Sequence, residues 1–270
     1  MTKLSVFNRS RALKLGFKLI KLSFSFSLII FIFNCENQDR SSAFKSNLAN
    51  KSVAGLIGSE YAVNSRHEWN IANNRIECLV STEDRKMYLR THQLSDQKGD
   101  LEMRVNLGFY NNKITSSNIN WAGFNIGFQG PFKQNLDKPN DNNGINLGVC
   151  TNGTLFIGDP GPNQKNDLVI DQLSQGISLV LTIQPDGETY TLLAAIYNRE
   201  TGALLSKVSK KQVMPNELSG RLALVSNFEN LGNPKLYKEK SVWFKDWNVR
   251  GSKVIKSPNN LEQQNEIKRN

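Results

Sequence analysis

Apolar and polar residues alternate with a period of two along much of the chain between residues 69 and 254. Successive side chains of a β-strand point to opposite faces of a sheet, so this period predicts strands that place one face on a core. The clearest runs are 101–109, 122–128, 145–149, 177–183 and 190–196. No long amphipathic helix separates them, which favours an antiparallel all-β fold over an α/β fold.

Turn residues stand between the predicted strands. Asn152-Gly153 joins two apolar runs and is a strong signal for a short hairpin. Pro185-Asp186-Gly187 and residues 199–202 carry turn chemistry of the same kind. The whole pattern predicts a two-sheet antiparallel β-sandwich with one core.

Two further expectations concern which residues share a face. In the run 122–128, alternation places Ala122, Phe124, Ile126 and Phe128 on one side of the strand. Trp243 and Trp247 are four residues apart in a strand-like run, so the same rule points both rings into the core.

The first 34 residues have the pattern of an export signal. Residues 1–21 contain six Lys or Arg and no acid, and the uncharged stretch 22–34 follows them. That stretch is shorter than the roughly 20 apolar residues of a spanning helix. It ends at Cys35, and the sequence before this cysteine resembles a lipobox, with Asn34 in place of the usual small residue. We therefore expect Cys35 to be lipidated; an uncleaved signal anchor is the alternative.

The chain is thus expected to have four parts: a lipoprotein signal peptide (1–34), a tether (35–55), the β-sandwich (56–254) and a disordered tail (255–270). Removing the six charges of the signal from the net charge of +10 leaves +4. The body is close to balanced, which argues against a nucleic-acid-binding surface. The predicted location is the bacterial cell envelope, with the lipid holding the protein to a membrane.

Cys78 and Cys150 are the cysteines that remain after Cys35. An exported compartment permits a disulfide between them. The favoured interpretation is nevertheless two buried thiols, because both lie in strand-like runs and a free cysteine behaves as a small apolar residue.

The connection 129–144 is rich in Asn and Asp and is the favoured place for a ligand. Asp137 and Asp141 offer hard oxygen ligands for calcium, and Asn142 can both donate to and accept from sugar hydroxyls. Trp121 opens the strand before this connection and is a candidate for stacking on a sugar. A solvated surface loop is the alternative reading.

Several runs together resemble the laminin-G-like, concanavalin A-like sandwich that precedes the metallophosphatase domain of exported PhoD-like alkaline phosphatases. They are Glu68–Ile71, Asn74–Cys78, Leu89–Leu94, Gly99–Met103, Trp121–Gly127, Thr151–Gly158, Val242–Trp247 and Gly251–Lys253. The resemblance covers about residues 56–254 and implies a concanavalin A-like jelly roll. The 17 residues after Lys253 contain no His, Cys or Asp. A two-metal phosphatase needs such ligands, so we expect its catalytic half to be absent.

These observations predict a non-catalytic sandwich that binds a glycan or a partner protein of the envelope and possesses no enzyme activity of its own. It would serve as an accessory module to a separate metallophosphatase. The alternative is a glycan-active hydrolase or lyase on the same fold. Retaining glycosidases need two carboxylates about 5 Å apart. The Glu-x-Asp-x-x-Glu strand of concanavalin A-like glucanases does not occur in the sequence.

Overall fold

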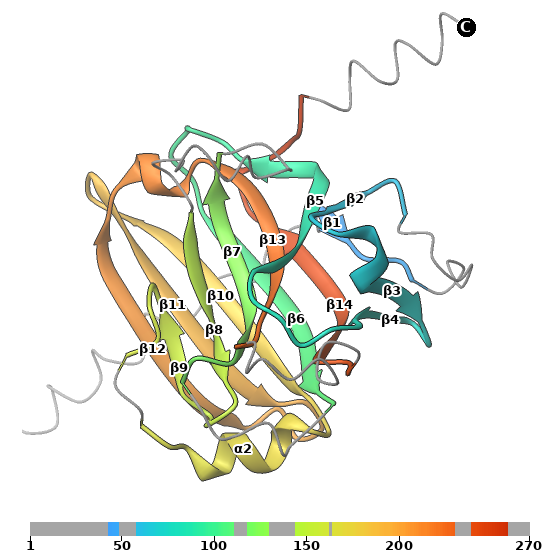
Figure 1. Cartoon of the computed structure of the whole chain (residues 1–270). Coiled ribbons are helices and arrows are strands. Elements are labelled where there is room, and N and C mark those ends of the chain that lie inside the picture. Colours follow the sequence, from blue (N-terminus) through green and yellow to red (C-terminus); the bar gives the residue numbers. More distant parts are fainter. Residues whose placement is uncertain are drawn as a thin grey trace, which may run out of the picture. The chain divides into compact units, whose positions relative to one another are not determined.

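The computed structural model describes residues 43–48, 58–110, 118–129, 144–161, 164–229 and 239–258. Contacts divide the chain into residues 1–40 and 41–270, and every described residue belongs to the second unit. That unit is built from two antiparallel sheets that face each other (Figure 1). The predicted two-sheet β-sandwich is confirmed.

Sheet A is the eight-stranded sheet. Its strands, in spatial order, are β12 (Leu204–Val213), β11 (Thr189–Asn198), β10 (Ile177–Asp186), β6 (Leu101–Phe109), β14 (Val242–Arg250), β4 (Arg75–Cys78) and β3 (Trp69–Ala72), and β1 (Phe44–Lys45) pairs with β14. Phe44 and Lys45 lie in the stretch expected to be a tether, so part of that stretch pairs with the sandwich.

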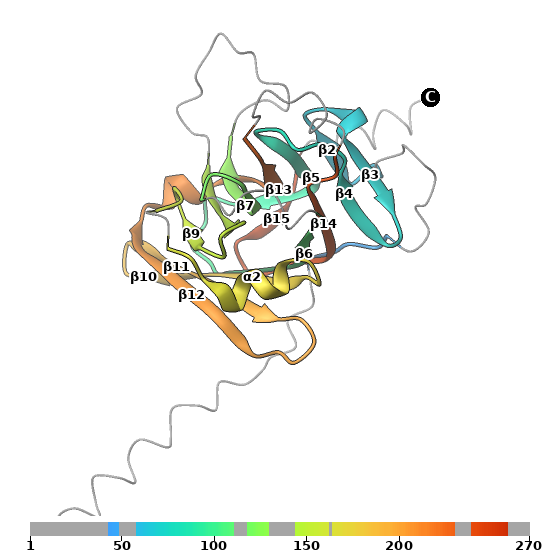
Figure 2. The ribbon, with the colours of Figure 1, turned by 60° about the horizontal axis from the view of Figure 1, so that its bottom comes forward.

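Sheet B is the seven-stranded sheet. Its strands are β15 (Val254–Lys256), β5 (Arg85–Leu94), β13 (Gly220–Asn227), β7 (Trp121–Phe128), β8 (Ile145–Cys150) and β9 (Leu155–Ile157), and β2 (Tyr61–Val63) pairs with β5. In Figure 2, β7, β13 and β5 form one layer and β10, β11 and β12 the other.

Helical structure among the described residues is short. The elements are η1 (Arg66–Glu68), α2 (Asp167–Leu173) and η2 (Pro215–Leu218). The side chain of Asn166 caps α2 by accepting a hydrogen bond from the backbone N–H of Val169. Val169 and Leu173 are buried, and α2 contacts β6, β10 and β12 at the end of the sandwich that Figure 2 brings forward. No helix in the described part of the chain is long and apolar enough to cross a membrane.

The core forms where the apolar rows of the two sheets meet. Leu179 and Leu181 of β10 pair in register with Val105 and Met103 of β6, and all four are fully buried. Phe124 of β7 belongs to the same apolar cluster from the opposite sheet. Burial of this kind contributes about 25 cal/mol for each Å² of apolar surface removed from water.

The predicted turns are also present. β8 and β9 form a hairpin in which Gly153 has a φ of 81° and the Asn152 side chain accepts a hydrogen bond from Thr154 N. Gly187 and Gly202, with φ of 62° and 71°, turn the chain between β10 and β11 and between β11 and β12. A positive φ costs glycine little because it has no Cβ.

The prediction that Trp243 and Trp247 share a face is wrong. The register of β14 shifts between Lys245 and Asn248, and Asp246 adopts a φ of 56° at this bulge. The extra residue reverses the alternation, so Trp247 lies in the core whereas Trp243 lies on the outer face of sheet A. There its ring covers Gly108, where an added Cβ would come within 2.6 Å of it.

A second irregularity corrects the face expected for Phe128. Gly127 has a φ of 76°, and the pairing of β7 with β13 shifts beside it. Ile126 therefore stays in the core, while Phe128 packs against Tyr88 and Ala223 outside it.

Cys78 and Cys150 do not form a disulfide; both are free and buried. Burial raises the pKa of the Cys78 thiol, and it raises the pKa of the Cys150 thiol to about 12. Both groups are therefore neutral thiols at neutral pH and act as small apolar residues.

We expect Leu181→Asp to destabilise the fold severely and Glu102→Gln to have a small effect. Leu181 is fully buried, and an unpaired carboxylate there should lower the free energy of unfolding by about 3 kcal/mol or more. Glu102 forms an ion pair with Arg250 at 2.7 Å, with both side chains more than a third exposed, so its loss should cost less than about 1 kcal/mol. Thermal unfolding of the two variants checks this; similar shifts in Tm would contradict the assigned faces.

Lys253 offers a second test, because it is fully buried with no carboxylate bonded to its ammonium group in the described structure. Its Nζ donates hydrogen bonds to the carbonyl oxygens of Ser95 at 2.8 Å and Gln97 at 3.2 Å. Lys253→Met would leave both carbonyls without this donor and should lower the free energy of unfolding by about 1–3 kcal/mol. The exposed Lys256→Met is the matched control, and equal stability of both variants would refute a structural role for Lys253.

Candidate functional site

The candidate site is the outer face of sheet B, which points away from the core. The alternation that places Phe124 and Ile126 in the core turns Asn125 to this outer face. The same rule turns Asn146 of β8 and Arg221 of β13 outward, because their neighbours Leu147 and Leu222 are core residues.

Aromatic residues gather at two places on this outer face, outside the main core. Trp121 meets Phe156 edge to face, with ring centroids 5.1 Å apart, in a cluster with Cys150 and Val225. Tyr88 packs against Phe128 with centroids 5.3 Å apart. These pairings stabilise the sheet beyond the burial of area alone. Trp121 is the first residue of β7, as expected. Its side chain is only 6% exposed, so it offers little ring surface to a sugar.

An amide pair lies on the same face. Asn125 and Asn146 stand opposite each other on β7 and β8, and Asn125 Nδ2 donates a hydrogen bond of 2.8 Å to Asn146 Oδ1. Asn125 is buried, whereas Asn146 is half-buried and its own Nδ2 group is not engaged in that bond. The next outward pair is Gly123 with Gly148, where an added Cβ on either residue would collide with the neighbouring strand. Neither asparagine was predicted as a site residue, because the only signal in the sequence was an amide within an otherwise apolar strand.

Two cations border the Tyr88–Phe128 pair. Lys86 Nζ lies 5.7 Å from the Phe128 ring centroid and forms an ion pair of 2.6 Å with Asp84. Arg221 is partly buried, and loss of water lowers the pKa of its guanidinium, an effect that the nearby Tyr88 partly offsets. Burial raises the pKa of Tyr88, and Asp84 raises it further, so its hydroxyl stays protonated at neutral pH.

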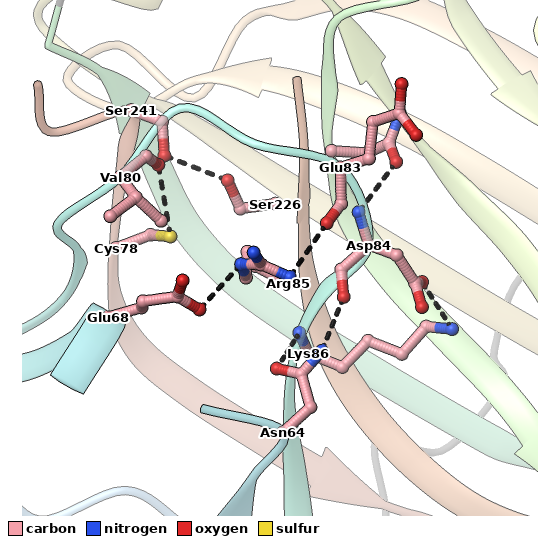
Figure 3. A network of polar contacts seen from close by, with 11 residues as sticks. Asn64, Glu68, Cys78, Val80, Glu83, Asp84, Arg85, Lys86, Ser226 and Ser241 are labelled. Atoms are coloured by element: carbon pink, nitrogen blue, oxygen red, sulfur yellow. Dashed lines mark hydrogen bonds and ion pairs between the residues drawn. The ribbon is translucent and has the colours of Figure 1, made fainter. Parts of the chain in front are cut away.

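A polar network fixes the turn that leads into β5 (Figure 3). The Asn64 side chain accepts from Lys86 N at 3.1 Å and donates to the carbonyl oxygen of Asp84 at 2.6 Å. Asp84 N in turn donates to Asn227 Oδ1 of β13 at 3.0 Å. These bonds hold the start of β5 against β13 and so position Lys86 and Tyr88 on the outer face.

The rest of the network in Figure 3 is structural. Arg85 pairs with Glu68 at 2.6 Å, and its guanidinium also donates to the carbonyl oxygen of Glu83 at 3.2 Å. The buried Cys78 thiol donates to the carbonyl oxygen of Val80 at 3.4 Å. A neutral, buried thiol is a poor nucleophile. Among the described residues, no three His, Cys, Asp or Glu side chains come together as a metal site would require.

Carboxylates are distributed unevenly between the two sheets. The described strands of sheet B contain no Asp or Glu, whereas those of sheet A contain Glu77, Glu102, Asp186 and Asp246. The amides on the outer face of sheet B can donate and accept hydrogen bonds. The described strands of sheet B do not supply the pair of carboxylates that glycoside hydrolysis uses.

A hollow of about 430 Å³ opens elsewhere, between β9, the start of α2 and β12. Its lining includes Thr154, Lys165, Asn166, Ser206 and Lys207, and no aromatic residue. The hollow offers hydroxyl, amide and ammonium groups to a ligand.

Asp137, Asp141 and Asn142 lie outside the described residues, as do Cys35 and the signal peptide. The connection that contains the three candidate ligands runs from Phe128, the last residue of β7, to Ile145, the first of β8. It therefore leaves and re-enters the sheet beside the Asn125–Asn146 pair. Calcium at Asp137 and Asp141 stays a prediction.

The fold is similar to solved structures of sugar-binding and sugar-cleaving proteins. Lectin II from Ulex europaeus matches with a TM-score of 0.54 and 8% identity, covering 78% of this chain and 99% of that chain. Its galactose complex matches with a TM-score of 0.53. Endo-1,3-β-glucanase from Streptomyces sioyaensis matches with a TM-score of 0.51 and 10% identity, covering 78% and 96%. No protein-family model and no curated protein matches the sequence. At these identities the likeness shows the fold alone, a concanavalin A-like sandwich.

Proposed function

We propose that this protein is a non-catalytic glycan-binding protein and that the outer face of sheet B, around Asn125 and Asn146, holds the glycan. The observation that carries the proposal is the hydrogen-bonded pair Asn125–Asn146, which lies across β7 and β8 between two aromatic clusters. The pair and both clusters lie outside the main core. Amides can both donate to and accept from sugar hydroxyls. Asn146 and Arg221 are only partly buried and would make the contacts, with the buried rings as a rigid floor.

Binding without hydrolysis is supported by the absence of carboxylates from the described strands of sheet B. A hydrolase or lyase would have to bring acidic groups to this face from the connections between strands. The similarity to a lectin and to a glucanase is compatible with either activity, so binding is inferred from the residues of the face itself.

The test is Asn146→Ala with Asn106→Ala as its matched control. Asn106 is a half-buried amide on the outer face of sheet A, where its Nδ2 donates to Asp246 Oδ2 at 3.0 Å. Each variant loses one amide hydrogen bond, so both should lose about 1 kcal/mol of stability. On a glycan array, followed by titration of the best ligand, Asn146→Ala should weaken binding about fivefold and Asn106→Ala should leave it unchanged. Equal affinity of all three proteins, or loss in the control alone, would move the site away from sheet B.

We also propose that the protein is held to an envelope membrane by a lipid on Cys35. The basic residues 1–21 and the uncharged stretch 22–34 that ends at this cysteine support the proposal. The resemblance of the sandwich to that of PhoD-like phosphatases favours a metallophosphatase as its partner.

A labelled fatty acid supplied to growing cells should mark the wild type and not the Cys35→Ser variant. The thioether-linked lipid needs the cysteine sulfur, so the expected result is complete loss of label. Cys78→Ser is the matched control and should remain labelled. Equal labelling of wild type and Cys35→Ser would refute the anchor.

A further inference from the structure

β12 forms one edge of sheet A (Figure 1). It pairs with β11 on one side, and no other described strand pairs with it. Of the ten residues of β12, only Val213 is buried. An edge strand presents backbone N–H and C=O groups to whatever lies beside it. The edge at β12 is therefore an open surface of the described sandwich.

Three lysines give this edge a positive charge. Lys207, Lys210 and Lys211 are exposed, and no described acid forms an ion pair with any of them. The strands β9, β11 and β12 contain no Asp or Glu. Lys207 stands opposite Ala195 on the outer side of β11, whereas Lys210 stands opposite the core residue Leu192. The lysines thus leave β12 on both of its faces and flank the open edge.

Exposed apolar side chains lie around the same strand. Leu204 is the first residue of β12 and is 50% exposed, and the exposed Met214 follows its last residue. Leu193 is exposed on the neighbouring strand β11. Leu168 of α2 is 68% exposed and lines the hollow of about 430 Å³ together with residues 206–208 of β12. Single exposed leucines are ordinary, but several around one strand indicate an interaction surface. We call these four residues and the three lysines the β12 surface.

The mixture of ammonium groups and apolar side chains favours one kind of occupant. Lysines on an edge strand oppose the addition of another strand, and a second copy would bring its own lysines against them. A nucleic acid would match the lysines but would leave the leucines without an apolar partner. An anionic bilayer matches both, because its phosphate groups lie directly above an apolar layer. Lysine side chains reach the phosphates while neighbouring leucines enter the boundary of the acyl region.

We infer that the β12 surface is where this protein lies on a bilayer that contains anionic phospholipid. The lysines contact the headgroup phosphates, and the apolar residues contact the outer part of the acyl layer. The inference is independent of glycan binding, and it gives an orientation to the protein that the proposed lipid on Cys35 holds at the membrane. Because the bilayer would meet the sandwich at an edge, the outer face of sheet B stays open to a glycan.

The experiment compares the purified full chain in vesicles of phosphatidylcholine alone and in vesicles that also contain phosphatidylglycerol. Flotation measures attachment to the vesicles, and hydrogen exchange measures protection of the backbone N–H groups in residues 204–214. These groups should exchange about tenfold more slowly in the vesicles with phosphatidylglycerol, because the bilayer covers the open edge. In about 1 M salt, where the Debye length falls to about 3 Å, the difference should disappear.

Two sets of variants separate the charged from the apolar part of the β12 surface. Replacing Lys207, Lys210 and Lys211 together with Gln should reduce the slowing to less than about twofold. Replacing Leu168 and Leu204 together with Ser should also reduce it, with the charge unchanged. The matched control replaces Lys45, Lys245 and Lys256 of β1, β14 and β15 with Gln and should keep the full slowing. Equal Tm values in detergent would show that each variant is folded.

The possible failures are distinguishable. A chain that floats with both kinds of vesicle and exchanges equally in both would overturn the inference and leave the lipid anchor standing. A chain that floats with neither would overturn the inference and the anchor together. Equal loss of slowing in the control variant would reduce the effect to net charge and overturn the assignment to β12. Slowing by soluble dextran sulfate but not by vesicles would overturn the inference in favour of a soluble polyanion.

Discussion

Burial of one apolar face of each sheet against the other is the interaction on which the rest of this structure depends. Leu179 and Leu181 of β10, Met103 and Val105 of β6, and Phe124 of β7 are fully buried in a single cluster. Because a strand has only two faces, burying one face in the core leaves only the other face for contacts outside the core. The chemistry of this protein is therefore confined to outer faces, sheet edges and connections.

The two outer faces have different chemistry. The outer face of sheet A carries cross-strand polar pairs, such as Glu102 with Arg250 and Asn106 with Asp246, which water can reach. The outer face of sheet B carries buried rings and the Asn125–Asn146 amide pair. Burying an amide costs free energy unless its hydrogen bonds are satisfied, and the bond across β7 and β8 satisfies one donor group of the buried Asn125.

Breaks in the strand alternation explain where sequence reasoning failed. Asp246 and Gly127 adopt positive φ angles at irregular places in β14 and β7, and each break moves an aromatic residue, Trp243 or Phe128, to an outer face. Counting by twos assumes an unbroken strand. A bulge depends on how the neighbouring strand pairs, and it cannot be predicted from the residues that flank it in the sequence.

The sequence by itself determined the strands, the hairpin turns and the inward rows, because side-chain alternation and turn chemistry are properties of consecutive residues. It did not determine which strands lie side by side. β5, β13, β7 and β8 come from separate stretches of the chain, and only their pairing brings Tyr88, Arg221, Asn125 and Asn146 onto one face. The same pairing placed all carboxylates of the described strands in sheet A. Strand pairing is made by backbone hydrogen bonds that nearly every residue type can form, so the strand order and the face it creates belong to the tertiary structure.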